Sequence, residues 1–219
     1  MLEFVRRNRV LLSSGFFLLC SLGLLYANAR QPGRMPELRI VAGEWRGRRI
    51  AVPAGAVRPT ADRVREAWMS IVAPALDGAR VLDLCSGSGA LGLEALSRGA
   101  AHCDFVEREP RVLTTLRRNL QVLGAGSRAT VHRAEAVRFV TEREAGAPRW
   151  DVAFADPPYG DDTAVALAAC WLRAPFAAIF GVEHAAGTTL PDAAAGPPGT
   201  TADRRVYGGT AITILRMDS

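Results

Sequence analysis

Residues 81–89 read Val-Leu-Asp-Leu-Cys-Ser-Gly-Ser-Gly, and a helical pattern follows directly over residues 90–97. An apolar strand that enters a glycine loop and then a helix is typical of a doubly wound α/β sheet, where ligands bind at the carboxyl ends of the strands. Glycines in such a loop let the backbone approach a ligand closely. The stretch therefore predicts a parallel sheet with a ligand site at this loop.

The alternation of apolar runs with helical patterns continues downstream. Strand character is found at residues 80–84, 103–106, 129–132, 152–155 and 176–182, and helical spacing at 90–97, 111–123, 137–143 and 164–173. Strands that are apolar throughout and separated by helices indicate a parallel sheet covered on both faces. Two more runs, 204–207 and 211–215, flank Gly208-Gly209 and predict an antiparallel edge hairpin. We expect a Rossmann-like α/β domain over residues 78–219, with a mostly parallel seven-stranded sheet.

A smaller element is expected before this domain, over residues 35–77. Two short strand-like runs surround residues 43–47, Gly-Glu-Trp-Arg-Gly, which indicates a β-hairpin. Apolar residues then recur at helical spacing between Val64 and Val72, and Thr60 after Pro59 is a candidate N-cap. The sequence therefore predicts a hairpin and one helix ahead of the sheet.

Residues 1–34 do not match the rest of the chain. Residues 10–27 form a nearly unbroken apolar run, with three arginines before it and Ala-Asn-Ala after it. This pattern is typical of a signal peptide or a membrane anchor. Because the residues after Met35 resemble a cytoplasmic enzyme, we favour a translation start at Met35; the alternative is an anchor, through residues 10–27, on the cytoplasmic face of a membrane.

The composition indicates a folded protein with an anionic partner. The chain has 219 residues, 49% of them hydrophobic and 22% charged, which suits one domain with a short appendage. Its net charge of +5 favours a polyanion, but all 27 basic residues are Arg, which a general Arg bias of the proteome explains equally well. The four cysteines and three histidines are scattered along the chain, so we expect no metal site.

The glycine loop fits two kinds of cofactor. Gly87, Gly89 and Gly92 match the spacing of dinucleotide-binding loops. Asp83, four residues before the first glycine, would repel a pyrophosphate but would attract a cationic amino-acid group. The pattern Asp-x-x-x-Gly-x-Gly resembles the S-adenosylmethionine loop of class I methyltransferases, which we prefer.

Two acidic residues follow the next strands. Glu107 ends the second strand, where an acid accepts hydrogen bonds from ribose hydroxyls in NAD enzymes and other nucleotide-binding sheets alike. Glu135 follows the third strand and has two interpretations, a contact with the adenine amino group or an acid at a helix N-terminus.

The tetrapeptide Asp156-Pro157-Pro158-Tyr159 follows the strand at 152–155. Two prolines would end a strand in any case, yet the tetrapeptide resembles the [Asp/Asn/Ser]-Pro-Pro-[Tyr/Phe] motif of amino methyltransferases. An exocyclic amine is a weak nucleophile because its lone pair is delocalised into the ring. The Asp156 carboxylate and the Pro157 carbonyl would hold its N–H groups and orient the nitrogen, while Tyr159 would stack on a base turned out of its helix.

Several ordered motifs together are similar to one family, the bacterial RsmD-type small-subunit ribosomal RNA guanine-N2 methyltransferases. These motifs lie at residues 39–43, 46–48, 58–60, 62–66, 81–89, 156–159 and 207–208, and the resemblance covers residues 38–215. It implies a class I fold, S-adenosylmethionine as methyl donor, and a guanine N2 of 16S ribosomal RNA in an assembling small subunit as acceptor. We further expect a cytoplasmic monomer whose residues 35–77 face the RNA.

The resemblance also implies residue roles. The catalytic residues would be Asp156, Pro157, Pro158 and Tyr159. The cofactor would be bound by Asp83, Cys85, Ser86, Gly87, Ser88, Gly89, Glu107, Arg108, Glu135 and Ala136. The RNA would be contacted by Arg46, Arg48, Arg58, Thr60, Arg63 and Arg65. Glu135 stands where the family more often has Asp, and Trp68 where it more often has Phe.

Two alternatives stay open from the sequence. A DNA adenine-N6 methyltransferase shares the Asp-Pro-Pro-Tyr chemistry, but such enzymes usually carry a target-recognition domain that this length does not accommodate. A non-catalytic RNA-binding or ribosome-assembly factor could keep the cofactor pocket alone. The intact Asp156 and Tyr159 argue against that second alternative.

Overall fold

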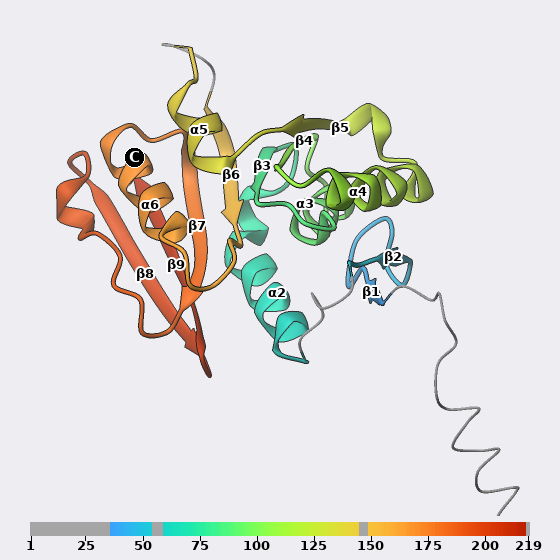
Figure 1. Cartoon of the computed structure of the whole chain (residues 1–219), viewed down its shortest axis with the longest axis horizontal. Coiled ribbons are helices and arrows are strands. Elements are labelled where there is room, and N and C mark those ends of the chain that lie inside the picture. The colour runs from blue at the N-terminus through green and yellow to red at the C-terminus, as the bar shows by residue number, and fades with distance from the viewer. Residues whose placement is uncertain (1–35, 54–58, 145–148, 218–219) are drawn as a thin grey trace, which may run out of the picture. The chain divides into compact units, whose positions relative to one another are not determined.

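The computed structural model describes residues 36–53, 59–144 and 149–217, with the backbone alone over 59–63. Within these ranges, seven strands form one sheet in the order β5-β4-β3-β6-β7-β9-β8 (Figure 1). The strands are β3 (Arg80–Leu84), β4 (His102–Glu107), β5 (Ala129–Arg133), β6 (Trp150–Ala155), β7 (Ala177–Ala185), β8 (Thr200–Tyr207) and β9 (Thr210–Met217). The predicted seven-stranded Rossmann-like sheet is confirmed.

The direction of the strands explains where a ligand can bind. β5, β4, β3, β6 and β7 run parallel, whereas β9 pairs antiparallel with both β7 and β8. The chain passes from β3 outward to β4 and β5, then returns to the other side of β3 as β6. Adjacent connections therefore leave the sheet on opposite faces between β3 and β6, and a crevice opens at the carboxyl ends of these two strands.

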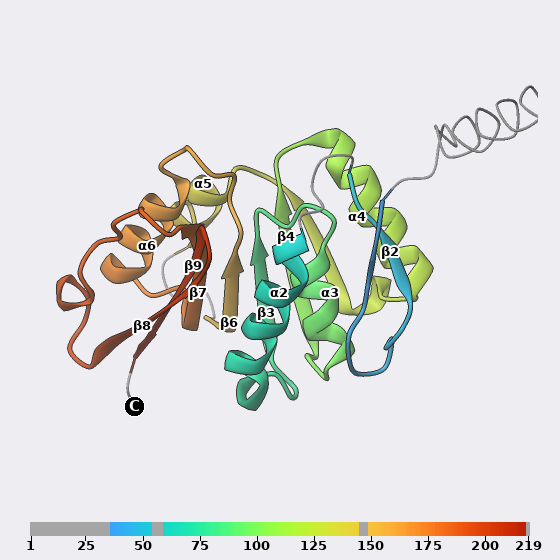
Figure 2. The same ribbon diagram turned by 90° about the horizontal axis from the view of Figure 1, so that it is seen from below.

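Helices cover both faces of the sheet, as Figures 1 and 2 show. α2 (Pro59–Val72), α3 (Ala90–Ser97) and α4 (Pro110–Leu123) pack on one face, and α5 (Ala136–Thr141) and α6 (Thr163–Arg173) on the other. Three short 3₁₀ turns are also present in the described ranges, at Ala73–Ala75, Gly126–Arg128 and Ala193–Ala195. Alternate residues of β3 serve the two cores, since Val81 faces the first set of helices and Leu82 the second.

The N-terminal hairpin of β1 (Glu37–Arg39) and β2 (Arg49–Ala51) is tied to α3 by buried polar contacts. The fully buried Glu94 carboxylate accepts hydrogen bonds from the backbone N–H groups of Val41 and Ala42, at 2.8 and 3.0 Å. Ser97 accepts from the N–H of Trp45 at 2.9 Å. Each contact satisfies a backbone N–H group of the hairpin and so holds the hairpin on α3. The hairpin belongs to the compact unit Pro36–Ser219.

Asn119 of α4 attaches β2 to the glycine loop. Its Oδ1 accepts from the Ala51 N–H at 2.9 Å, and its Nδ2 donates to the carbonyls of Ala51 at 2.8 Å and Ser88 at 2.9 Å. The side chain is 1% exposed, so these bonds are shielded from water. One amide therefore positions the end of the hairpin relative to the loop after β3.

Some predicted boundaries were wrong. α2 begins at Pro59, so Thr60 is the second helical residue and not the N-cap; proline suits a first helical position because the N–H it lacks has no intrahelical partner there. α2 ends at Val72 and a 3₁₀ turn separates it from Asp77-Gly78. β8 and β9 are longer than predicted because they pair along their whole length from Thr200 to Met217.

The apolar run at residues 10–27 lies outside the described residues, as does Arg58. None of the helices in the described ranges combines the length and the apolarity that a membrane crossing needs. The division proposed at residues 77 and 78 stays a prediction about function, since both sides of it belong to one compact unit.

We predict that Asn119→Leu destabilises the protein by about 2–4 kcal/mol. Leu has as many side-chain heavy atoms as Asn but makes no hydrogen bonds. It leaves the buried Ser88 carbonyl without this partner, and a fully buried group of this kind costs about 1–3 kcal/mol; the Ala51 N–H and carbonyl are only partly buried, so they add less. The free energy of unfolding in urea measures the effect. The control is Gln121→Leu, an exposed position on the same helix, where we expect a change within about 0.5 kcal/mol; equal effects of the two substitutions would contradict the role of Asn119.

Candidate active site

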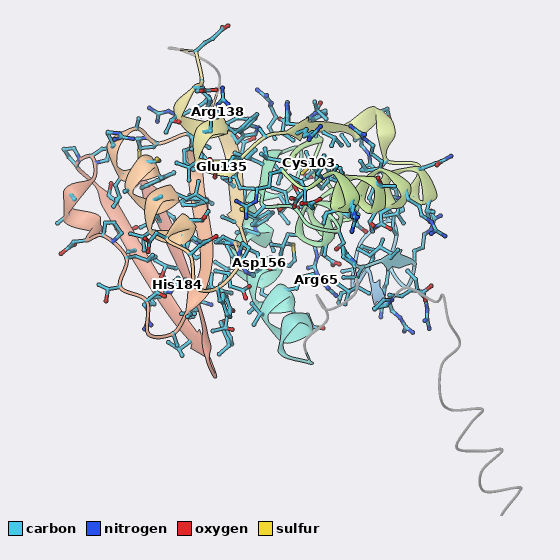
Figure 3. The ribbon with its side chains drawn as sticks, viewed as in Figure 1. Arg65, Cys103, Glu135, Arg138, Asp156 and His184 are labelled. Atoms are coloured by element: carbon cyan, nitrogen blue, oxygen red, sulfur yellow. The ribbon has the colours of Figure 1, made fainter. Side chains whose placement is uncertain are left out.

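A cavity of about 630 Å³ opens at the carboxyl ends of β3 and β6. It is lined by the glycine loop (residues 85–88), the end of β4 and the residues after it, the loop between β5 and α5, residues 156–159, and the inner side of α2. Figure 3 labels Arg65, Glu135 and Asp156, which come from three separate segments and all line this cavity. Segments far apart in the sequence therefore enclose one site at the place that the topology of the sheet indicates.

The glycines of the loop have different tasks. A Cβ at Gly87, where φ is +56°, would meet only the Cys85 carbonyl at 4.0 Å, so the backbone is open toward the cavity. A Cβ at Gly89 would lie 2.5 Å from Leu116, and one at Gly92 would lie 2.4 Å from Phe105. Gly89 and Gly92 are thus required for packing α3 against its neighbours. Two of the three glycines that match the dinucleotide-binding spacing, Gly89 and Gly92, are therefore explained by helix packing and do not identify the cofactor.

Asp83 is the buried acid of the site. Its Oδ2 accepts a hydrogen bond from the Gly92 N–H at 2.9 Å, and the residue is 2% exposed. Burial raises the pKa of Asp83 well above its usual value; the Gly92 hydrogen bond opposes this shift, and the charges of Asp156 and Glu107 add to it. A cationic group in the cavity would relieve this accumulation of negative charge.

Backbone amides hold the other two acids in place. Glu107 accepts from the N–H of Gly87 at 3.0 Å and from that of Glu109 at 2.9 Å. Glu135 caps α5, since its two carboxylate oxygens accept from Val137 and Arg138. The structure thus bears out the helix-terminus interpretation of Glu135, while its contact with an adenine stays a prediction.

The remaining residues of the predicted cofactor set shape the loop wall. Ser86 donates from its hydroxyl to the Asp83 carbonyl at 2.7 Å and to the Val106 carbonyl at 3.0 Å, which joins the loop to β4. Burial raises the pKa of the Cys85 thiol to about 12, so this thiol is neutral. Ser88, Arg108 and Ala136 also line the cavity, whereas Gly89 lies behind the wall.

Residues 156–159 line the same cavity as the glycine loop, and the two segments follow the neighbouring strands β6 and β3. Asp156 directly follows β6, and Pro157 after it is buried. The Tyr159 hydroxyl donates to Glu183 Oε1 at 2.7 Å and lies 2.6 Å from Thr210 Oγ1. Burial raises the pKa of Tyr159 to about 12, so the phenol stays protonated at neutral pH. The aromatic ring is therefore anchored by β7 and β9.

The predicted RNA-contacting residues do not all gather at the cavity. Arg65 lines it and donates from Nη2 to the Arg39 carbonyl at 3.0 Å. Arg46 and Arg48 lie in the exposed turn of the hairpin and do not line the cavity. For Thr60 and Arg63 the structure gives the helical backbone alone.

Sequence reasoning missed several polar residues that position the site. Glu183 and Thr210 hold Tyr159, and Glu94 and Asn119 hold the hairpin. An acid within the strongly apolar helix at residues 90–97 was the available signal for Glu94, because such a group is buried only with hydrogen-bond partners. Asn119 lies among polar and charged residues and gave no such signal. Glu183 and Thr210 gave no comparable signal.

The match to a protein family covers most of this structure. The family model described as Conserved hypothetical protein 95 matches residues 38–215. The chain belongs to this family. The matched residues are the same 38–215 over which the sequence resembles RsmD-type enzymes. That resemblance is confirmed by this match and by the curated relatives.

Two curated relatives of this family member are named as ribosomal RNA methyltransferases. "Putative rRNA methyltransferase YlbH" of Bacillus subtilis is 40% identical over 134 residues, which are 59% of this chain and 71% of that protein. "Ribosomal RNA small subunit methyltransferase D" of Escherichia coli is 44% identical over 124 residues, which are 56% of this chain and 61% of that protein.

Solved structures show the same fold. The "Putative methyltransferase yhhF from Escherichia coli" has a TM-score of 0.72 and 33% identity, covering 84% of this chain and 99% of that one. The Thermus thermophilus 16S rRNA N2 G1207 methyltransferase RsmC, in complex with AdoMet and guanosine, has a TM-score of 0.62 at 20% identity, covering 86% of this chain and 52% of that one. At that identity the second likeness concerns the fold alone.

The described residues contain no cluster of three or more His, Cys, Asp or Glu side chains arranged to hold a metal ion. His132 pairs with Asp104 Oδ1 at 2.8 Å, and His184 Nε2 lies 2.9 Å from Thr213 Oγ1, so these two rings are part of the packed sheet.

We predict that Asp83→Asn removes a pH dependence of stability. Because the folded pKa of Asp83 is raised above its unfolded value of about 3.9, the native state holds the extra proton between these two pKa values. Wild-type stability should therefore fall as pH rises through this window. Asn keeps an acceptor for the Gly92 N–H but does not titrate, so the variant should gain stability relative to wild type as pH rises. Urea unfolding between about pH 5 and pH 9 tests this, and parallel profiles would contradict it.

Proposed function

We propose that this protein transfers a methyl group from S-adenosylmethionine to the exocyclic N2 of a guanine in small-subunit ribosomal RNA. The observation that supports the proposal is that residues 156–159 line the same cavity as Asp83 and Gly87. Family membership and the names of the relatives support the same reaction.

The chemistry of the cavity fits this methyl donor. Asp83, Glu107 and Glu135 line it with carboxylates, and Gly87 leaves its backbone open. A sulfonium ion with an amino-acid tail is cationic, so negative lining favours it and disfavours a pyrophosphate. When bound, S-adenosylmethionine supplies an electrophilic methyl group, and the same fold in RsmC holds AdoMet and guanosine. We assign the cofactor contacts to Asp83, residues 85–88, Glu107, Arg108, Glu135 and Ala136, whereas the predicted contact of Gly89 is not kept because Gly89 does not line the cavity.

The residues of the motif position the acceptor. The Asp156 carboxylate and the Pro157 carbonyl accept hydrogen bonds from the guanine amino group, which holds the nitrogen toward the glycine loop. Methyl transfer would replace one N–H of this amine by N–CH₃, with the thioether as the leaving group, and would release that proton to water. Asp156 stabilises the positive charge that develops on the nitrogen before that proton leaves. Tyr159, fixed by Glu183 and Thr210, offers a rigid ring on which the base stacks.

The wider setting belongs to the same proposal. The substrate is ribosomal RNA, met in an assembling small subunit, and the protein acts as a monomer in the cytoplasm. Arg65 contacts the RNA at the mouth of the cavity, together with Arg58, Thr60 and Arg63 of the adjoining segment.

The test is to delete the gene and map the missing base methylations of ribosomal RNA by nuclease digestion and mass spectrometry. Loss of one N2-methylguanosine from 16S RNA, restored by the purified protein with S-adenosylmethionine, supports the proposal. Loss of an N6-methyladenosine from DNA would establish the rival activity, and unchanged methylation of both nucleic acids would refute the proposal.

We predict that Asp156→Ala lowers methyl transfer by about 10²-fold or more, since removal of one positioned charge-stabilising group typically costs that much. The affinity for S-adenosylmethionine should stay within about 3-fold of wild type because Asp156 faces the acceptor. Single-turnover kinetics with tritiated cofactor and isothermal titration give the two quantities. An unchanged rate would show that Asp156 does not hold the amine.

We predict that Tyr159→Phe keeps most of the activity, whereas Tyr159→Ala loses it. Phe preserves the stacking ring and removes only the hydroxyl, while Ala removes a stacking interaction that is worth about 1–3 kcal/mol per base. The Ala variant should therefore raise the KM for RNA by about 5- to 100-fold. A similar loss in both variants would shift the essential role from the ring to the hydroxyl.

A further inference from the structure

The exposed face of α4 carries arginine and no acidic residue. Between Pro110 and Leu123 the charged residues are Arg111, Arg117 and Arg118, and all three are exposed. None of them forms an ion pair or a side-chain hydrogen bond within the part of the chain that the structure describes. Their charge is therefore not neutralised by the fold.

Two of these arginines share one side of α4. Asn119 points toward β2, because its amide bonds Ala51. With about 100° of rotation per helical residue, Arg111 and Arg118 lie on one stripe, within about 20° of each other around the helix and about 80–100° from Asn119. Arg117 lies about 160° from Asn119 and about 100–120° from Arg111 and Arg118. Arg111 and Arg118 are separated by about two turns, or roughly 10 Å along the axis.

Arg48 extends this stripe onto the hairpin. Its Nη2 donates to the Val122 carbonyl near the C-terminal end of α4, and Figure 2 shows β2 running beside α4. Just before the other end of the helix, Arg108 lines the cavity. Arg111, Arg118 and Arg48, which we call the α4 stripe, therefore lead away from the mouth of the cavity.

The acids of the hairpin do not compensate the stripe. Glu37 pairs with Arg49 at 3.0 Å, and Glu44 pairs with Arg128 at 2.7 Å. Both acids thus have other cationic partners. What remains beside the cavity is a row of guanidinium groups, whose planar donors match the oxygens of a phosphate.

We propose that the α4 stripe binds the phosphate backbone of the RNA strand whose target base enters the cavity. The inference rests on the proposed function for the identity of the polyanion. Phosphates that meet uncompensated arginines release condensed counterions, so binding along the stripe is salt-dependent and tolerant of sequence. α4 would then bind substrate in addition to packing on the sheet.

The experiment compares variants of the full chain in binding a fluorescein-labelled single-stranded RNA of mixed sequence, by anisotropy over a salt series. Each arginine that neutralises one phosphate of a single strand contributes about 0.7 to the slope of log K against log salt, so Arg111→Gln with Arg118→Gln should lower the slope by about 1.4. The matched control is Arg117→Gln, adjacent in sequence but about 100–120° around α4 from the stripe, where the slope should not change.

Two outcomes overturn the inference. A slope that is unchanged in the double variant removes the stripe from the RNA interface, which would leave a protein partner as its occupant. An equal effect of Arg117→Gln shows a general charge effect and no oriented surface. Isothermal titration with S-adenosylmethionine verifies that each variant is folded.

Methyl transfer by the wild-type protein separates this inference from the proposed function. If the wild type methylates ribosomal RNA and the double variant binds RNA as the wild type does, the stripe is wrong and the function stands. If the wild type binds RNA with the expected change of slope but transfers no methyl group, the function is wrong and the surface stands.

Discussion

The structure depends on one buried carboxyl group, that of Asp83, at the end of the central strand. Its hydrogen bond to the Gly92 N–H joins the end of β3 to the first turn of α3, and the close packing at Gly89 and Gly92 then fixes that helix against β4. α3 in turn holds the hairpin through Glu94. Burial disfavours this acid, and the hydrogen bond from the Gly92 N–H partly offsets that cost.

The sequence was sufficient for the sheet, since apolar runs and helical spacing repeat from residue 80 to residue 182. It also identified two segments of the cavity wall, residues 81–89 and 156–159, because the conformation of each is determined by its own glycines or prolines. It failed where the answer depends on partners distant in the chain. It did not predict that Glu183 and Thr210 hold Tyr159, because these residues come together only in the folded sheet. The start of α2 was also misplaced at Thr60, since Pro59 is already helical.

Polar groups in the packed layers explain the rest of that failure. Asn119 is indistinguishable in sequence from a surface amide, yet it carries three hydrogen bonds to the hairpin and the loop. Nothing in the sequence near Glu183 predicts its contact with Tyr159, which forms because β7 and β9 are neighbours in the sheet. Local patterns report which face is apolar, whereas the few polar residues inside are determined by the backbone groups that the completed fold leaves unsatisfied.

The anchoring of Tyr159 by Thr210 has a consequence for the newly made protein. The two residues are 51 positions apart, and the strand that carries Thr210 inserts between β7 and β8. A nascent chain that has exposed the motif but not yet this strand has an unfixed aromatic ring and an incomplete sheet. The anchor of the ring therefore forms only after synthesis has passed Thr210, well after the motif itself has been made.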